Sequence, residues 1–103
     1  MGEGLNFRFA HTLTGRLFGL TRKSVCVQGE VLVLLPCRSI HTFGMKEDID
    51  VAFFDSRGRV MKAVRALPPR RFCSCRGAAG VLERRSARGA FWFESGDSVK
   101  LIN

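Results

Sequence analysis

Residues that could do chemistry together lie close to one another in the first half of the chain. Cys37, His41 and Asp50 could act as a nucleophile, a base and the acid that orients the base. Cys37 and His41 could alternatively join Cys73 and Cys75 in a zinc site of three cysteines and one histidine. The cysteine and histidine spacings are poor matches to the usual zinc ligand spacings. For the catalytic pattern, three residue types scattered through a sequence are weak evidence without geometry. We therefore expect no metal and no other cofactor, and rank an enzyme third among the candidate functions.

Asp50 stands in an apolar segment, between Ile49 and Val51. A carboxylate in such a segment must be exposed on one face, or hydrogen-bonded if it is buried. The favoured interpretation is a mostly buried structural acid that accepts backbone N–H groups or pairs with an arginine such as Arg16. The alternative is an acid in a cleft whose pKa is shifted by its surroundings.

The chain carries a net charge of +8, and the excess sits in one third of the sequence. Residues 57–88 hold ten cations against the single acid Glu83, a net of +9, whereas the rest of the chain is −1. A solvated basic face is the favoured interpretation, because no motif that would read bases accompanies the charges. The alternative is weak, sequence-independent binding of nucleic acid or another polyanion. The cations of this candidate patch are Arg57, Arg59, Lys62, Arg65, Arg70, Arg71, Arg76, Arg84, Arg85 and Arg88.

Four cysteines and the absence of an export signal bear on the compartment. The N-terminus shows no basic segment followed by an apolar one, and no apolar run approaches the ~20 residues of a membrane helix. We expect a cytoplasmic, monomeric protein without membrane contact. In that compartment the cysteines should be thiols rather than disulfides; they are Cys26, Cys37, Cys73 and Cys75.

Hydrophobic patterning predicts a mainly-β protein of one domain spanning residues 1–103, a β-sandwich or partly open barrel with one or two short helices. Asp55 and Gly58 are expected to be the first and last residues of a type I hairpin turn, and Pro68-Pro69 should end the strand that follows the turn. A short helix is expected over 14–22 and a helical turn or bend over 87–93. Strands are expected over residues 5–10, 30–35, 49–55, 59–66, 79–84 and 98–102.

Two smaller features each have two interpretations. Phe91-Trp92-Phe93 is expected to place its phenylalanines in the core and leave the tryptophan partly exposed. The alternative is a stacking platform beside the arginines. Glu83 is expected to offset Arg84, Arg85 or a neighbour across the sheet.

Several motifs lie in an order and at a spacing that match a known family. The matching residues are Arg16, Gly19, Leu20, Arg22, Cys37, His41, Thr42, Phe43, Gly44, Met45, Ile49, Asp50, Val51, Phe53, Asp55, Pro68, Arg70, Val81, Leu82, Glu83, Gly89, Gly96 and Asp97. Through these residues the chain resembles domain-of-unknown-function family 192 over about residues 15–101, which implies a compact β-sandwich with short helices and no established activity. Glu47-Asp48 replace the aromatic-proline pair that is usual in that family.

Together these features predict a non-catalytic binding or accessory module with its site at the loop of residues 37–50. The partner would be an unidentified small molecule or protein, with weak nucleic-acid binding as the alternative. The residues expected to form the cleft are Arg16, His41, Thr42, Met45, Asp50 and Arg70.

Overall fold

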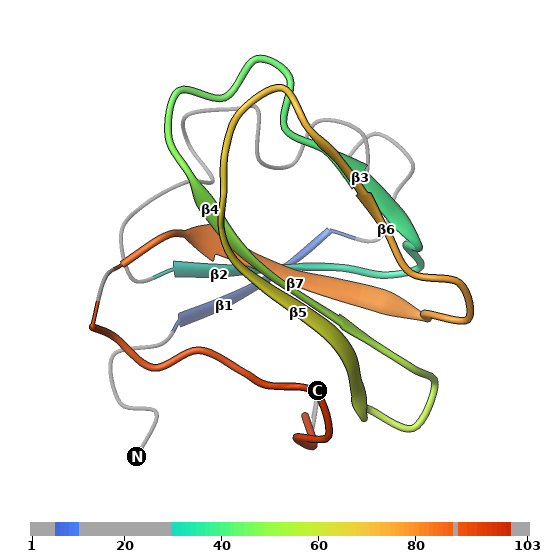
Figure 1. The fold of residues 1–103 in the computed structure, drawn as a ribbon. Helices are drawn as coiled ribbons and strands as arrows, with labels where there is room; N and C mark the ends of the chain where they lie inside the picture. Colours follow the sequence, from blue (N-terminus) through green and yellow to red (C-terminus); the bar gives the residue numbers. More distant parts are fainter. Residues whose placement is uncertain (1–5, 11–29, 88, 100–103) are drawn as a thin grey trace.

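The chain folds mainly into β-structure. The computed structural model describes residues 6–10, 30–87 and 89–99 (Figure 1). These residues form seven strands and no helix, so the mainly-β fold expected from the sequence is confirmed. In this part of the chain nothing helical has the length and apolar character needed to cross a membrane. The strands are β1 (Asn6–Ala10), β2 (Glu30–Leu34), β3 (Ser39–His41), β4 (Ile49–Phe54), β5 (Val60–Leu67), β6 (Phe72–Ser74) and β7 (Gly80–Arg85).

Five of the strands form one sheet in the order β1-β2-β7-β4-β5. β1 and β2 are parallel, while the pairs β2–β7, β7–β4 and β4–β5 are antiparallel. β3 and β6 form a separate antiparallel pair, which lies at the upper right of Figure 1. We call this pair the β3–β6 ribbon. Because the described strands divide into two sheets, they do not close into a barrel.

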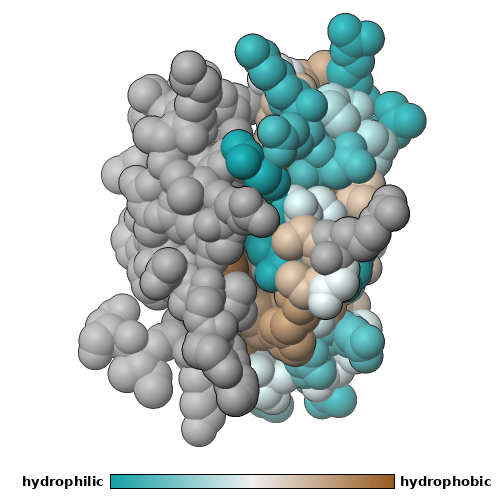
Figure 2. Space-filling view, turned by 90° about the vertical axis from the view of Figure 1, so that its left-hand side faces the viewer, coloured by the Kyte–Doolittle hydropathy of each residue, from teal (hydrophilic) through white to brown (hydrophobic). Residues whose placement is uncertain are grey.

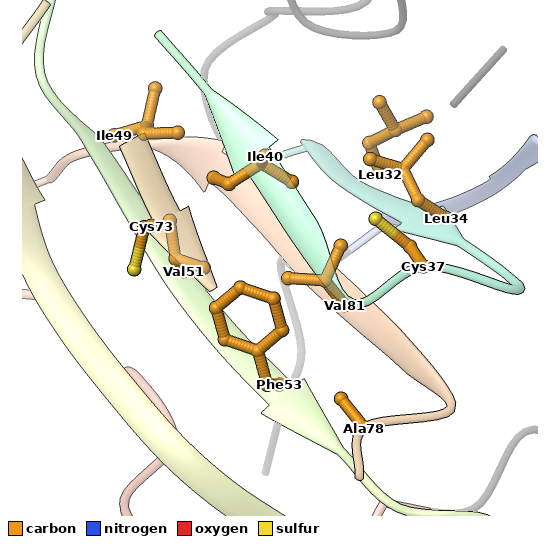
Figure 3. Close-up of a cluster of buried hydrophobic side chains, with 10 residues drawn as sticks. All are labelled: Leu32, Leu34, Cys37, Ile40, Ile49, Val51, Phe53, Cys73, Ala78 and Val81. Atoms are coloured by element: carbon orange, nitrogen blue, oxygen red, sulfur yellow. The ribbon is translucent and has the colours of Figure 1, made fainter. Parts of the chain in front are cut away.

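The large sheet has an apolar core on each face because its inner strand β4, between β7 and β5, is buried along its whole length. Alternate side chains of a strand point to opposite faces. On one face, Val51 and Phe53 pack with Ile40 and Cys73 of the β3–β6 ribbon, as Figure 3 shows. On the other face, Phe54 packs in a cluster that includes Trp92. The ribbon therefore covers one face, and the segment after β7 covers the other.

The hairpin between β4 and β5 follows the expected turn chemistry. The N–H of Gly58 donates to the carbonyl of Asp55 at 2.9 Å, and Asp55 Oδ1 accepts the N–H groups of Arg57 and Arg59. Gly58 has a φ of +85°, and a Cβ there would collide with the carbonyl oxygen of Val99. Glycine is therefore required at this turn for both its backbone conformation and its size.

Most expected strands are confirmed, with two differences. β3 and β6, which have three residues each, were not expected. Only an isolated bridge between Arg59 and Ser98 stands where a closing strand was expected at 98–102, and residues 100–102 lie outside the described residues. In the segment where a helical turn or bend was expected, Ala90 N–H donates to Ala87 O, and residues 91–93 are neither helix nor strand. The helix expected over 14–22 lies outside the described residues.

The prediction for the aromatic segment was wrong. Trp92 is buried, whereas Phe91 is largely exposed and Phe93 is only partly buried. The segment is not a strand, so the alternation on which the prediction rested does not apply. Trp92 is held inside because its ring packs in the second core cluster and its indole N–H donates to the carbonyl of Val51 at 3.1 Å.

Glu83 is a buried acid in the middle of the large sheet. It is only 2% exposed and is paired in register with Leu32 of β2 and Val51 of β4. No described residue forms a hydrogen bond or ion pair with it, so the expected partnership with Arg84 or Arg85 was wrong. Burial raises the pKa of Glu83 to about 8, because the charged form is disfavoured away from water.

The raised pKa of Glu83 predicts a loss of stability as the pH rises. Between the unfolded value of 4.5 and about 8, the folded chain holds a proton that the unfolded chain has lost. The free energy of unfolding should fall by up to about 1.4 kcal/mol per pH unit in that window. Glu83→Gln, measured by urea denaturation, should abolish that slope and be more stable than wild type at pH 8. The exposed Glu94→Gln is the control, and an unchanged slope in Glu83→Gln would contradict the prediction.

Candidate functional site

Asp50 sits at a β-bulge that brings donors to it from the neighbouring strands. On the β7 side it is paired directly with Arg84. On the β5 side the register shifts, so that Arg65 and Ala66 together lie opposite Asp50. Ala66 has a φ of +55°, a left-handed conformation that a non-glycine residue rarely adopts. This conformation lets the bulge offer its backbone N–H to the carboxylate.

Both oxygens of the fully buried Asp50 carboxylate are bonded. Oδ1 accepts the backbone N–H of Ala66 and the hydroxyl of Ser86, each at 3.0 Å. Oδ2 lies 3.1 Å from Nε and 3.0 Å from Nη2 of Arg84, and 3.5 Å from Nη2 of Arg65. The prediction of a buried, hydrogen-bonded Asp50 is confirmed, with Arg84 as its buried partner. The suggested partner Arg16 lies outside the described residues.

Arg84 is fixed from two sides. Its guanidinium binds Asp50 and lies 4.7 Å from the ring centre of Trp92, a cation–π arrangement. Since Trp92 is itself anchored to Val51 O, the three side chains form a continuous buried stack. The positive charge of Arg84 is therefore balanced by Asp50 inside the protein and does not contribute to a surface patch.

The environment of Asp50 favours its ionised form. Burial alone would raise the pKa of Asp50 above 3.8. The hydrogen bonds from Ala66, Ser86 and Arg84 and the charge of Arg65 outweigh burial and lower the pKa. A carboxylate that is ionised, inaccessible and fully bonded is suited to holding structure and poorly suited to exchanging protons with a substrate.

A cavity of about 440 Å³ opens beside the Asp50 network. Arg65, Ala66 and Ser86, which all bond Asp50, also form part of its wall. The rest of the wall contains Glu47, Asp48 and Gly89. We call this cavity the Arg65 pocket. Figure 2 views the molecule from the left-hand side of Figure 1 and shows mainly hydrophilic residues at the upper end of the described part.

Two contacts attach the loop that borders the Arg65 pocket to the end of β7. The backbone N–H of Ser86 donates to the carbonyl of Asp48 at 3.0 Å. Arg85 Nε lies 2.8 Å from Glu47 Oε1, a partly exposed ion pair of the kind that adds little stability. The acid of Glu47 is thus already paired, while no described residue bonds the side chain of Asp48.

Thr42 joins the other end of this loop to the segment before β6. Its hydroxyl donates to Pro68 O at 2.7 Å and accepts the N–H of Arg71 at 2.8 Å. Its own N–H donates to Arg71 O at 2.9 Å, and its carbonyl accepts the N–H of Arg70. Thr42 is completely buried. It therefore has a structural role rather than the place in a cleft that the sequence analysis assigned to it.

The other residues expected in the cleft lie apart from the Arg65 pocket. His41 is on the outer face of the β3–β6 ribbon, where its ring contacts Phe43 and Phe72. Met45 packs against the core cluster shown in Figure 3. Arg70 is exposed beside Thr42, with a φ of +66°. His41 and Met45 are not among the described residues that line the Arg65 pocket beside Asp50.

The structure does not assemble the catalytic or metal constellations considered for the sequence. Cys37 belongs to the core on one face of the large sheet, whereas Asp50 lies with Arg84 on the other. Among the described residues, no three histidine, cysteine or acidic side chains are grouped closely enough to hold a metal ion. Cys73 is buried, which raises the pKa of its thiol and makes it a poor nucleophile.

The ten cations of the expected basic patch differ in their exposure. Seven are exposed and one, Arg85, is half-buried and paired with Glu47. Arg84 is buried against Asp50, so its assignment to a surface patch was wrong. Arg88 lies outside the described residues. The exposed members are Arg57, Arg59, Lys62, Arg65, Arg70, Arg71 and Arg76.

Comparison with known proteins agrees with this fold. The model of domain-of-unknown-function family 192, described as "Uncharacterized ACR", matches residues 2–101. The chain belongs to this family. No curated protein matches. Membership of family 192 therefore brings a fold and no established activity.

Two solved structures are similar to this family 192 protein. One is a protein of unknown function from Novosphingobium aromaticivorans DSM 12444, 20% identical, with a TM-score of 0.76 over 92% of this chain and 74% of that one. The other is a proposed transcription regulator from Sinorhizobium meliloti 1021, 16% identical, with a TM-score of 0.67 over 78% of this chain and 67% of that one. At these identities the likeness supports the fold alone.

Loss of the Asp50 charge should destabilise the protein strongly. Asp50→Asn leaves the buried Arg84 without its counter-charge, which should lower the free energy of unfolding by about 3–5 kcal/mol at pH 7. Because the pKa of Asp50 is lowered in the folded state, its contribution is present above pH 3.8 and is lost as the pH falls below that value. The difference in the free energy of unfolding between wild type and Asp50→Asn should therefore become smaller in acid.

A double-mutant cycle with Arg84→Gln, measured by urea denaturation, tests the pairing directly. Asp50→Asn combined with Arg84→Gln should destabilise less than the two single changes added together. Additive losses would contradict the assignment of Arg84 as the partner of Asp50.

The Thr42 hydroxyl provides a second test. Thr42→Val keeps the shape of the side chain but leaves Arg71 N–H and Pro68 O without their partner, at a cost of about 1–3 kcal/mol. Thr42→Ser keeps the hydroxyl and should cost less. Equal denaturation midpoints for wild type and Thr42→Val would show that the hydroxyl is dispensable.

Proposed function

We propose that this protein is a non-catalytic binding module that takes a small zwitterionic molecule in the Arg65 pocket. The observation that carries this proposal is the partly exposed guanidinium of Arg65 in the pocket wall. The site lies at the 47–48 end of the loop that the sequence analysis singled out. Its volume of about 440 Å³ is within the range of small-molecule pockets.

Arg65 has donors to spare for a ligand. Its side chain is 45% exposed, and Nη2 alone bonds described residues, at Ala87 O and Asp50 Oδ2. Nη1 and Nε remain available for an anionic group such as a carboxylate. Because Nη2 is anchored, the guanidinium is held in place before a ligand arrives, which reduces the entropy lost on binding.

The acids of the pocket favour a ligand that also carries a positive charge. Glu47 is neutralised by Arg85, but Asp48 has no counter-charge among the described residues. A purely anionic ligand would approach Asp48 unfavourably, whereas an ammonium group would pair with it. A carboxylate for Arg65 and an ammonium for Asp48 together describe an amino acid or a similar zwitterion.

The chemistry around the pocket supports binding rather than catalysis. The carboxylate of Asp50 is fully bonded and has no exposed surface. His41 and the buried thiols lie on other parts of the fold. The pocket wall thus offers fixed charges and hydrogen-bond groups but no paired nucleophile and base.

An NMR titration tests this proposal with glutamate, succinate and inorganic phosphate as probes. Glutamate should shift the amide signals of Ser86 and Gly89 saturably, and more strongly than succinate or phosphate. Arg65→Ala should weaken glutamate binding about tenfold or more, because a charge-assisted hydrogen bond is lost. Arg57→Ala removes an exposed arginine outside the pocket and should leave binding unchanged. The proposal fails if no probe shifts these signals, or if Arg65→Ala binds glutamate as tightly as wild type.

A further inference from the structure

The outer face of the β3–β6 ribbon displays aromatic rings that the core does not use. Alternation along the two strands turns Ile40 and Cys73 inward and places His41 and Phe72 outward, as a directly paired couple. Phe43 follows His41 across the buried Thr42 and lies beside them. Phe72 is 74% exposed and Phe43 is 43% exposed.

These three side chains touch one another as a cluster. The ring centres of Phe43 and Phe72 are 5.2 Å apart, and His41 lies 5.7 Å from Phe43 and 6.3 Å from Phe72. The rings are tilted or edge-on to each other, so their faces remain partly open. Exposed aromatic surface of this kind is costly in water and is typical of binding sites.

The described segments that carry the aromatic cluster and its neighbours contain cations and no acids. Residues 37–46 and 56–82, which include both ribbon strands, contain no Asp or Glu. Arg70 and Arg71 come directly before Phe72, and their backbones are fixed by Thr42. At the far end of the ribbon, Arg38 O accepts the N–H of Cys75, and along the edge Lys62 Nζ donates to Ser74 O.

We propose that the outer face of the β3–β6 ribbon binds single-stranded nucleic acid, a function beyond that of the Arg65 pocket. One or two bases would stack on Phe72 and Phe43, while Arg70 and Arg71 contact the adjoining phosphates. Stacking on a ring face does not depend on the identity of the base. In a duplex the base faces are already stacked, so the ribbon should prefer single strands.

The charges also argue against a second copy of this chain as the occupant. Joining two such faces would bring the arginines beside Phe72 of both copies together, and like charges repel. A polyanion instead neutralises them and releases bound counterions. Charge complementarity therefore selects a polyanion, and the aromatic rings select one with exposed bases.

Fluorescence anisotropy with a labelled oligothymidine tests the proposal. Phe72→Ala should weaken binding about fivefold to a hundredfold, the loss expected for one stacked base. Phe91→Ala removes an exposed phenylalanine outside the ribbon and should have no effect. An abasic strand of the same length keeps the phosphates and lacks the bases, so it should bind wild type as weakly as the intact strand binds Phe72→Ala.

The phosphate contacts are tested separately, through the salt dependence of binding. Replacement of Arg70 or Arg71 by alanine should reduce the slope of log K against log salt by about 0.7 each, while Arg57→Ala should reduce it less. Equal binding of intact and abasic strands, or of wild type and Phe72→Ala, would overturn the proposal in favour of charge alone. Sedimentation showing a dimer that Phe72→Ala dissociates would overturn it in favour of self-association.

Discussion

The buried negative charge of Asp50 constrains how this end of the fold can be built. A carboxylate with no exposed surface is tolerated only if its oxygens are bonded and its charge is balanced. The donors come from the β5 bulge, from β7 and from the segment after β7. Those segments are distant in sequence, so satisfying one side chain ties an edge strand and the later covering segment to the centre of the sheet. Trp92 extends the constraint, because its ring can cover Arg84 only when the segment folds back over that face.

The two faces of the large sheet shift the pKa of a buried acid in opposite directions, although Glu83 and Arg84 are neighbours on one strand. The face with Asp50 supplies counter-charges and lowers the pKa of the acid. On the other face, Glu83 is paired in register with the apolar residues Leu32 and Val51, and burial raises its pKa. The two acids therefore make the free energy of unfolding change with pH in opposite directions. The stabilisation by Asp50 is lost in acid, whereas Glu83 lowers the stability once the pH rises above 4.5, its pKa in the unfolded chain. As far as these two groups determine it, stability is greatest in mildly acidic solution.

Long strands and turns could be predicted from the sequence because β2, β4, β5 and β7 carry their own hydrophobic pattern. β3 and β6 could not, since three residues are too few to show a period and each exists through its partner. The burial of Asp50 followed from its apolar neighbours, but Arg84 as its partner depends on cross-strand register, which sequence does not display. Arg65 and Ser86 were missed for the same reason. Nothing in the sequence marks that Phe43 and Phe72 meet on one surface.

The loop from Thr42 to Asp48 separates the two candidate sites by charge. Its first end is fastened to the cationic segment before β6, and its last end is fastened to Ser86 at the rim of the Arg65 pocket. Along the loop the sign changes from Lys46 to Glu47 and Asp48. A polyanion drawn to the ribbon would thus meet repulsion at Asp48, while a small zwitterion could use Asp48 and Arg65 together. Under the two proposals, Asp48, one of the two residues at which this chain departs from the family pattern, would therefore confine each class of ligand to its own side of the loop.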